Sequence, residues 1–381
     1  MFFKQNLTPT LPILGFFNKI WSVLGLIPYN WNQEKGEYSE CGKIKYAYWV
    51  FSAVFLVGIQ TLYVNFQFIS FIQAMNANNL WGNVKSMGDF TVVTNIWLTY
   101  ITFSLYNLNT VLHYSDLVKF YNEHIRYRKE LRNTSVYLRN NLPIMYPLLL
   151  VVPLRFASLV SACISNPDSP IFVYSAFPSS WKTPIGHGIF VGMFIPFCAT
   201  FWVTLQFNVT TITMHVATVG TGIKHCAESK SGNIFEDLKM YRKFVLLTRL
   251  FENASGKLSF VANLISIISI CTVSAYGMIR FFGKIAPKLY VMFLSPVTCM
   301  NIYLIKVLLP SAMIRQNSTQ FKRNMLESSR GSRDLKLVKA VMSSLPDLRV
   351  KVGNYFTINR TSYFEVLGLI SVNTMTLLIN L

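Results

Sequence analysis

The stretch 258-LSFVANLISIISICTVSAYGMI-279 lies between Lys257 and Arg280 and contains no Asp, Glu, Lys or Arg. A helix needs about 20 mostly apolar residues to cross the hydrocarbon core of a bilayer, and this stretch is long enough. Three further charge-free stretches lie between Lys45 and Lys85, between Asp89 and Asp116, and between Lys182 and Lys224. The pattern predicts an all-α polytopic membrane protein.

The composition supports this class and excludes others. The chain of 381 residues is 52% apolar and 13% charged, whereas soluble domains are about a quarter charged. The net charge of +19 does not indicate a nucleic-acid partner, because the basic residues lie between apolar spans rather than on one soluble domain. The six cysteines have no metal-site or disulfide-scaffold spacing, so we expect no metal and no cofactor.

Seven transmembrane spans are predicted along the chain. The fourth is long enough to be strongly tilted or to project from the membrane as a helix. The predicted spans are Tyr46–Ile72, Phe90–Leu112, Leu142–Ile164, Ile185–Ala217, Leu258–Ile279, Leu289–Ile314 and Ser362–Leu381.

The positions of Lys and Arg predict the orientation. Cytosolic loops carry an excess of these residues, and with a cytosolic N-terminus the outer loops hold only Lys85, Lys182, Lys284 and Lys288, with Arg280 at the edge. We therefore expect a multi-pass plasma-membrane protein whose C-terminus is extracellular. This orientation is the reverse of that of a G-protein-coupled receptor.

The segments between the spans suggest four regions. Residues 1–44 form a cytosolic segment with an interfacial helix over Leu11–Pro28, and residues 45–320 hold spans one to six with cytosolic helical extensions. Residues 321–355 form a cytosolic anchor helix, and residues 356–381 hold the last span. The stretches 235–257 and 321–352 mix apolar and basic residues near the helical period, so they pack together in the cytosol or lie on anionic lipid.

The last span carries a polar stripe. At 100° per residue, most of its strongly polar positions fall within an arc of roughly 80°, while Ser371 and Thr374 fall elsewhere. The stripe consists of Ser362, Glu365, Leu369, Asn373, Thr376 and Asn380. Polar groups that faced lipid would be costly, so the stripe makes hydrogen bonds between helices or lines a water-filled pore. One helix cannot enclose a pore, so the second interpretation requires several subunits around a symmetry axis.

The C-terminal segment Gly353-Asn-Tyr-Phe-Thr-Ile-Asn-Arg360, followed by an apolar span, resembles the insect gustatory receptor family. Leu24-Gly-Leu-Ile-Pro28 is similar to that family's apolar segment before span one, and seven spans with a cytosolic N-terminus also match. Where that family's last helix carries Thr-Tyr and Gln-Phe, this chain reads Asn373-Thr374 and Asn380-Leu381. A divergent gustatory receptor or the related insect odorant receptor family fits this pattern.

The resemblance implies a ligand-gated cation channel made of four like or unlike subunits. The last helix of each subunit, Leu381 included, would line a pore for Na⁺, K⁺ and Ca²⁺, with membrane lipid around the assembly. A small organic ligand would bind among the outer halves of spans two to six. Depth and side-chain type select Trp97, Tyr100, Arg155, Phe156, Phe190, Phe194, Tyr276, Tyr290 and Phe293.

Two points stay open at this level. Arg155 lies near the middle of span three, where it binds a polar ligand group or pairs with a buried backbone carbonyl. A secondary transporter of a small organic solute and a seven-helix receptor without a channel are the alternatives to a ligand-gated channel. No arrangement of nucleophile and base indicates an enzyme.

Overall fold

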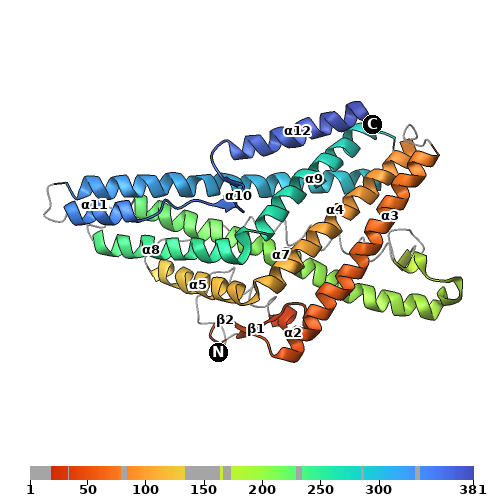
Figure 1. The fold of residues 1–381 in the computed structure, drawn as a ribbon, viewed down its shortest axis with the longest axis horizontal. Helices are drawn as coiled ribbons and strands as arrows, with labels where there is room; N and C mark the ends of the chain where they lie inside the picture. The colour runs from red at the N-terminus through yellow and green to blue at the C-terminus, as the bar shows by residue number, and fades with distance from the viewer. Residues whose placement is uncertain are drawn as a thin grey trace.

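A computed structural model describes residues 19–32, 34–78, 84–133, 164–165, 173–228, 234–284, 287–330 and 335–381. These residues form an elongated, mostly helical molecule (Figure 1). Long helices diverge at one end and run side by side at the other. The predicted third span, with Arg155 and Phe156, lies outside the described residues except for its last residue, Ile164.

The long helices follow the charge-free stretches of the sequence. The helices α2 and α3 are joined by a π-helical segment, η1, into one continuous rod, and α7 and α10 run well beyond the predicted ends of their spans. The bounds are α2 Lys43–Val50, η1 Phe51–Leu56, α3 Val57–Ala77, α4 Val84–Leu112, α7 Pro184–Glu228, α9 Ser259–Arg280, α10 Pro287–Ser328 and α12 Ser362–Asn380.

Among the described residues, five stretches of helix are long and apolar enough to cross a membrane. They are Lys43–Ala77, Pro184–Glu228, Ser259–Arg280, Phe293–Ser328 and Ser362–Asn380. The chain therefore has the character of a polytopic helical membrane protein. Two of the seven predicted spans are not in this set: the second span, which is α4, and the third, which lies outside the described residues except for Ile164.

Helix α4 contains many polar residues, which lowers its hydropathy, and it packs inside the bundle against α3, α7 and α9. Asn95, Asn107 and Asn109 are buried. The Asn109 amide donates to the carbonyl oxygen of Ala254 at 3.0 Å, and the Ser274 hydroxyl donates to Asn95 Oδ1 at 3.2 Å. Buried amides need such partners, so the polar residues of α4 suit a helix that is surrounded by other helices of the bundle.

The amphipathic stretches pack at the opposite end of the molecule, where α8 Ile234–Phe251 and α11 Leu335–Ser344 lie along the extended ends of α7 and α10 (Figure 1). The apolar face of α8 is fully buried at Tyr241, Phe244 and Leu247. Helix α5, Tyr114–Asn133, and the π-helical turn η5, Glu252–Gly256, complete this bundle. These stretches therefore pack on protein.

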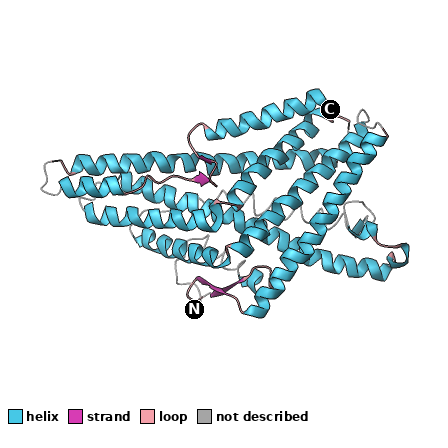
Figure 2. Cartoon of the chain, viewed as in Figure 1, coloured by secondary structure: helices cyan, strands magenta, loops and turns pink. Residues whose placement is uncertain are grey.

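Within the described residues, two short hairpins interrupt the helical structure (Figure 2). Strands β3 Lys351–Val352 and β4 Phe356–Thr357 lie just before α12. Strands β1 Tyr29–Asn32 and β2 Glu37–Glu40 pair near the N-terminal end of the described chain, and their turn contains Gly36 at φ 61°.

The N-terminal hairpin changes one expectation. Residues 11–18 of the predicted interfacial helix lie outside the described residues, and residues 19–23 are helical. Residues 24–28 are not helical but turn into β1. Trp21 is buried against Trp202, with ring centroids 6.0 Å apart, and Ile27 is also buried. Trp21 and Ile27 thus hold the segment on the protein, while Val23 and Leu24 are exposed, and an interfacial position for it stays a prediction.

Candidate functional site

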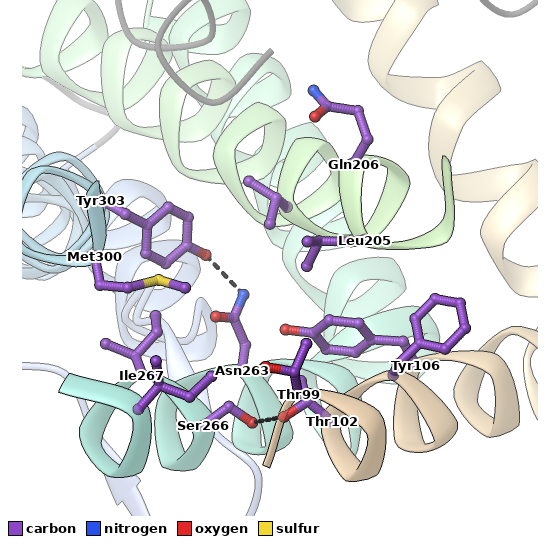
Figure 3. Close-up of a pocket in the computed structure, with 13 residues that line it drawn as sticks. Thr99, Thr102, Tyr106, Leu205, Gln206, Asn263, Ser266, Ile267, Met300 and Tyr303 are labelled. Atoms are coloured by element: carbon purple, nitrogen blue, oxygen red, sulfur yellow. Dashed lines mark hydrogen bonds between the residues drawn. The ribbon is translucent and has the colours of Figure 1, made fainter. Parts of the chain in front are cut away.

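A small cavity lies inside the helical bundle, between α4, α7, α9 and α10 (Figure 3). Its volume is about 90 Å³, whereas a single water needs roughly 10–15 Å³. It is lined by Thr99, Thr102, Phe103, Tyr106, Leu205, Gln206, Val209, Asn263, Ser266, Ile267, Ile270, Met300 and Tyr303. Four helices from distant parts of the sequence therefore contribute to one cavity.

The polar groups of this cavity are tied to each other across helices. Asn263 on α9 and Tyr303 on α10 point toward one another (Figure 3), and the amide donates to the phenol oxygen at 3.0 Å. On the other wall the hydroxyls of Thr102 and Ser266 are hydrogen-bonded, and Ser266 also donates to the carbonyl oxygen of Ala262 at 2.6 Å. These bonds fix the direction in which the polar groups face.

The remaining walls are apolar, with Phe103, Ile267, Ile270 and Met300 among them. An apolar space with a few oriented hydroxyl and amide groups suits a small organic molecule that carries one or two polar atoms. Met300 adds a flexible wall, since a methionine side chain adapts to different shapes.

Four residues predicted to bind ligand gather in a second cluster, beside the cavity and on two of the same helices. Trp97, Tyr100, Phe190 and Phe194 pack with Tyr174 of the short helix η3, Val173–Ala176. The Phe190 and Phe194 rings stack at 5.7 Å, and the Trp97 indole donates to the side-chain oxygen of Asn65. Their role in binding stays a prediction.

Two other predicted residues, Tyr276 and Phe293, lie in a third cluster. The Tyr276 hydroxyl is buried and has no hydrogen-bond partner among the described residues. Tyr290 lies nearby, edge-on to Phe282 at 5.9 Å. The roles of Tyr276, Tyr290 and Phe293 in binding stay predictions.

The residues around the cavity were not in the predicted set, because depth and aromatic character select other positions. Thr102 and Tyr106 follow Trp97 and Tyr100 by one or two turns of α4. A signal did exist on α9: Asn263, Ser266 and Ile270 repeat at helical spacing and share one face.

Helix α9 connects the cavity with α12. Asn263 faces the cavity, and Thr272 lies nine residues later, about 180° around the helix. On that opposite side α9 packs against α12, where the buried Thr374 hydroxyl donates to its own helix at Ile370 and reaches the carbonyl oxygen of Thr272 at 3.5 Å. A change at the cavity that shifts α9 would therefore also move the surface against which α12 packs.

The polar stripe of α12 lies mostly on the exposed surface of the chain. Ser362 is buried and Leu381 is half-buried, while Glu365, Leu369, Asn373, Thr376 and Asn380 are exposed. A neighbouring face is apolar and also exposed, through Phe364, Val372, Met375 and Ile379. An apolar exposed face beside a polar one is typical of a helix that meets both a partner or lipid and water.

Comparisons with known proteins agree with this architecture. Searches against protein-family models and curated proteins find no match to the chain. Among solved structures, the insect olfactory receptor OR5 from Machilis hrabei aligns over 97% of this chain and 99% of its own, with a TM-score of 0.57 and 9% identity. The same receptor in complex with eugenol aligns over 97% of both chains, with a TM-score of 0.64 and 11% identity.

The chain has the fold of an insect olfactory receptor. The likeness covers nearly the full length of both proteins, so it includes the divergent long helices as well as the bundle at the other end. At this low identity the comparison establishes the fold, and the roles of individual residues rest on their geometry in this chain.

Proposed function

We propose that this protein is a chemosensory receptor of the plasma membrane that acts as a ligand-gated, non-selective cation channel. A small organic tastant or odorant binds among α4, α7, α9 and α10, on the side of the bundle that opens to the outside. Four like or unlike subunits place their α12 helices around a common pore, which conducts Na⁺, K⁺ and Ca²⁺.

One observation carries this proposal: α9 lies between the cavity and the pore-lining candidate α12. A ligand that replaces the contacts of Asn263 or Ser266 changes which position of α9 is the more stable. Because α12 packs on the opposite face of α9, the two positions of α9 correspond to two positions of α12. A ligand shifts such an equilibrium only by its difference in affinity for the two states.

The ligand class follows from the walls of the cavity. Hydroxyl and amide groups surrounded by apolar side chains favour a compact molecule with an aromatic or aliphatic body and an oxygen substituent. The olfactory receptor with the same fold has been solved with eugenol, which supports an oxygenated aromatic molecule as the first class to test.

The pore assignment follows from α12. In a tetramer the exposed apolar face of Phe364, Val372 and Met375 meets lipid or a neighbouring subunit, and the adjacent polar stripe faces the axis. Glu365 lies at the inner end of the stripe and receives a hydrogen bond from Thr361. A ring of four carboxylates at this position attracts cations.

Whole-cell recording from cells that express the full-length chain tests the proposal. A panel of small oxygenated aromatics should evoke a cation current, and Glu365→Gln or Asn380→Ala should change its permeability or gating. Ser371→Ala serves as the control, because Ser371 is exposed on the same helix away from the stripe. Solute uptake without a channel-like current would instead favour a transporter.

A further inference from the structure

A polar groove lies between α10 and the turn that precedes α12, away from the ligand cavity. Its volume is about 710 Å³ and it is open to solvent. Three arginines line it: Arg315 and Arg323 from α10, and Arg360 from the turn. Arg315, Thr319 and Arg323 follow at intervals of four residues, so they share one face of the helix.

The arginines of this groove carry more charge than their neighbours neutralise. Arg323 Nε donates to Glu327 Oε1 at 2.9 Å, and Glu327 is the one acidic residue among those that line the groove. The Arg360 guanidinium donates to the neutral side chain of Gln316. The Arg315 carbonyl accepts a hydrogen bond from Thr319, but its guanidinium has no hydrogen-bond or ion-pair partner among the described residues. The groove therefore holds three positive charges and one negative charge.

The position of the groove relative to the apolar helices suggests the source of a ligand. Arg315 directly follows the apolar stretch of α10 that the sequence predicts to end at Ile314, and Arg360 lies two residues before α12 begins at Ser362. In the orientation of the proposed function, both points lie at the inner membrane surface. Basic pockets at this depth typically bind the headgroups of anionic lipids.

We propose that this groove binds a phosphate-ester anion, supplied by the phosphorylated headgroup of an inositol lipid in the inner leaflet. Guanidinium groups match phosphate oxygens with paired hydrogen bonds. The side-chain oxygens of Gln316 and Asn359 already accept hydrogen bonds from Arg360 and Thr361, so their amide N–H groups are the donors left for the hydroxyls of an inositol ring. The Thr319 hydroxyl donates to the Arg315 carbonyl oxygen, and its oxygen is left to accept. The lipid source rests on the orientation of the proposed function, whereas the phosphate chemistry rests on the groove alone.

A second copy of this chain is a poorer occupant of the groove. The groove holds three arginines and one glutamate, so a second copy would have to bring free carboxylates to it. Several described carboxylates are already engaged within the chain: Glu130 binds Lys243 at 2.6 Å and Glu252 binds Lys351 at 3.3 Å. A small polyanion does not meet this obstacle.

Native mass spectrometry of the purified full-length protein in detergent tests the assignment, with dioctanoyl phosphatidylinositol 4,5-bisphosphate as the probe. The wild-type protein should bind the probe, and Arg315→Gln combined with Arg360→Gln should weaken binding at least tenfold. Arg349→Gln is the control, because Arg349 is exposed and belongs to the same predicted cytosolic side but lies outside the groove. It should bind as the wild type does.

Three kinds of result would overturn the assignment. The first is a contrary binding pattern, either unchanged binding in the double variant or an equal loss in the Arg349 variant. The second is a lower oligomer mass in the double variant with normal lipid binding, which would assign the groove to contacts between copies. The third is an affinity for soluble inositol 1,4,5-trisphosphate equal to that for the lipid probe, which would show that the groove does not select a lipid. Since no current is recorded, a failed channel proposal leaves this test intact.

Discussion

Replacing Tyr303 by Phe removes one hydroxyl from the cavity and leaves the ring in place. In the native structure the Asn263 amide donates to that hydroxyl at 3.0 Å, and both residues are only 3% exposed. The variant leaves the amide donor buried without its partner. Such a group costs about 1–3 kcal/mol, so the unfolding free energy should fall by that amount.

The double variant gives the matched control. Asn263→Leu alone leaves the phenol hydroxyl without its donor, and we expect a similar loss of about 1–3 kcal/mol. Asn263→Leu together with Tyr303→Phe removes both polar groups, so its cost should be well below the sum of the two single costs. Denaturation of the purified protein in mixed micelles measures all three values.

The affinity of the Tyr303→Phe variant for ligands gives a second, independent test of this prediction. In Tyr303→Phe, a ligand with an acceptor oxygen can take the free Asn263 amide, whereas a hydrocarbon of the same shape cannot. The ratio of their affinities should therefore shift toward the oxygenated ligand, by roughly 5-fold to 150-fold for 1–3 kcal/mol. Additive single costs in the double variant, together with an unchanged affinity ratio, would refute the reasoning.

Three further predictions concern the bundle at the other end of the molecule. Gly222→Ala should lower stability by about 1–3 kcal/mol, because its new Cβ would lie 2.1 Å from the Phe244 ring, whereas Gly220→Ala should be tolerated; thermal melts compare them. Burial raises the pKa of Tyr241, so stability should fall as pH rises above about 10, and less steeply in Tyr241→Phe when unfolding is followed against pH. Lys322→Met removes bonds of 2.6 Å to the Leu345 carbonyl and the Asp347 carboxylate, so its melting temperature should fall.

The long helices could be predicted from the sequence because charge is a local property. The charge-free stretch 258–279 corresponds to α9, Ser259–Arg280, and the predicted start of the last span at Ser362 is the observed start of α12. The hairpin β1–β2 was missed because its strands are only four residues long. Its stability depends on distant partners, such as the stacking of Tyr29 on Phe207 at 5.3 Å.

The cavity could not be predicted because its polar residues meet only through tertiary packing. Asn263 and Tyr303 are 40 residues apart, and Thr102 and Ser266 are 164 residues apart. Each of these residues, taken alone on an apolar helix, is also compatible with an ordinary helix contact. The stripe of α12 was found because it repeats along one helix, which a periodicity can detect.

The central claim, that α12 lines a ligand-gated pore, is tested most directly by cysteine accessibility during recording. Asn373 is exposed on the stripe, whereas the adjacent Thr374 is buried against α9. A cationic thiol reagent added from the aqueous side should block the ligand-evoked current of Asn373→Cys and leave that of Thr374→Cys unchanged. Equal effects on both variants, or no effect on Asn373→Cys, would contradict a pore lined by this helix.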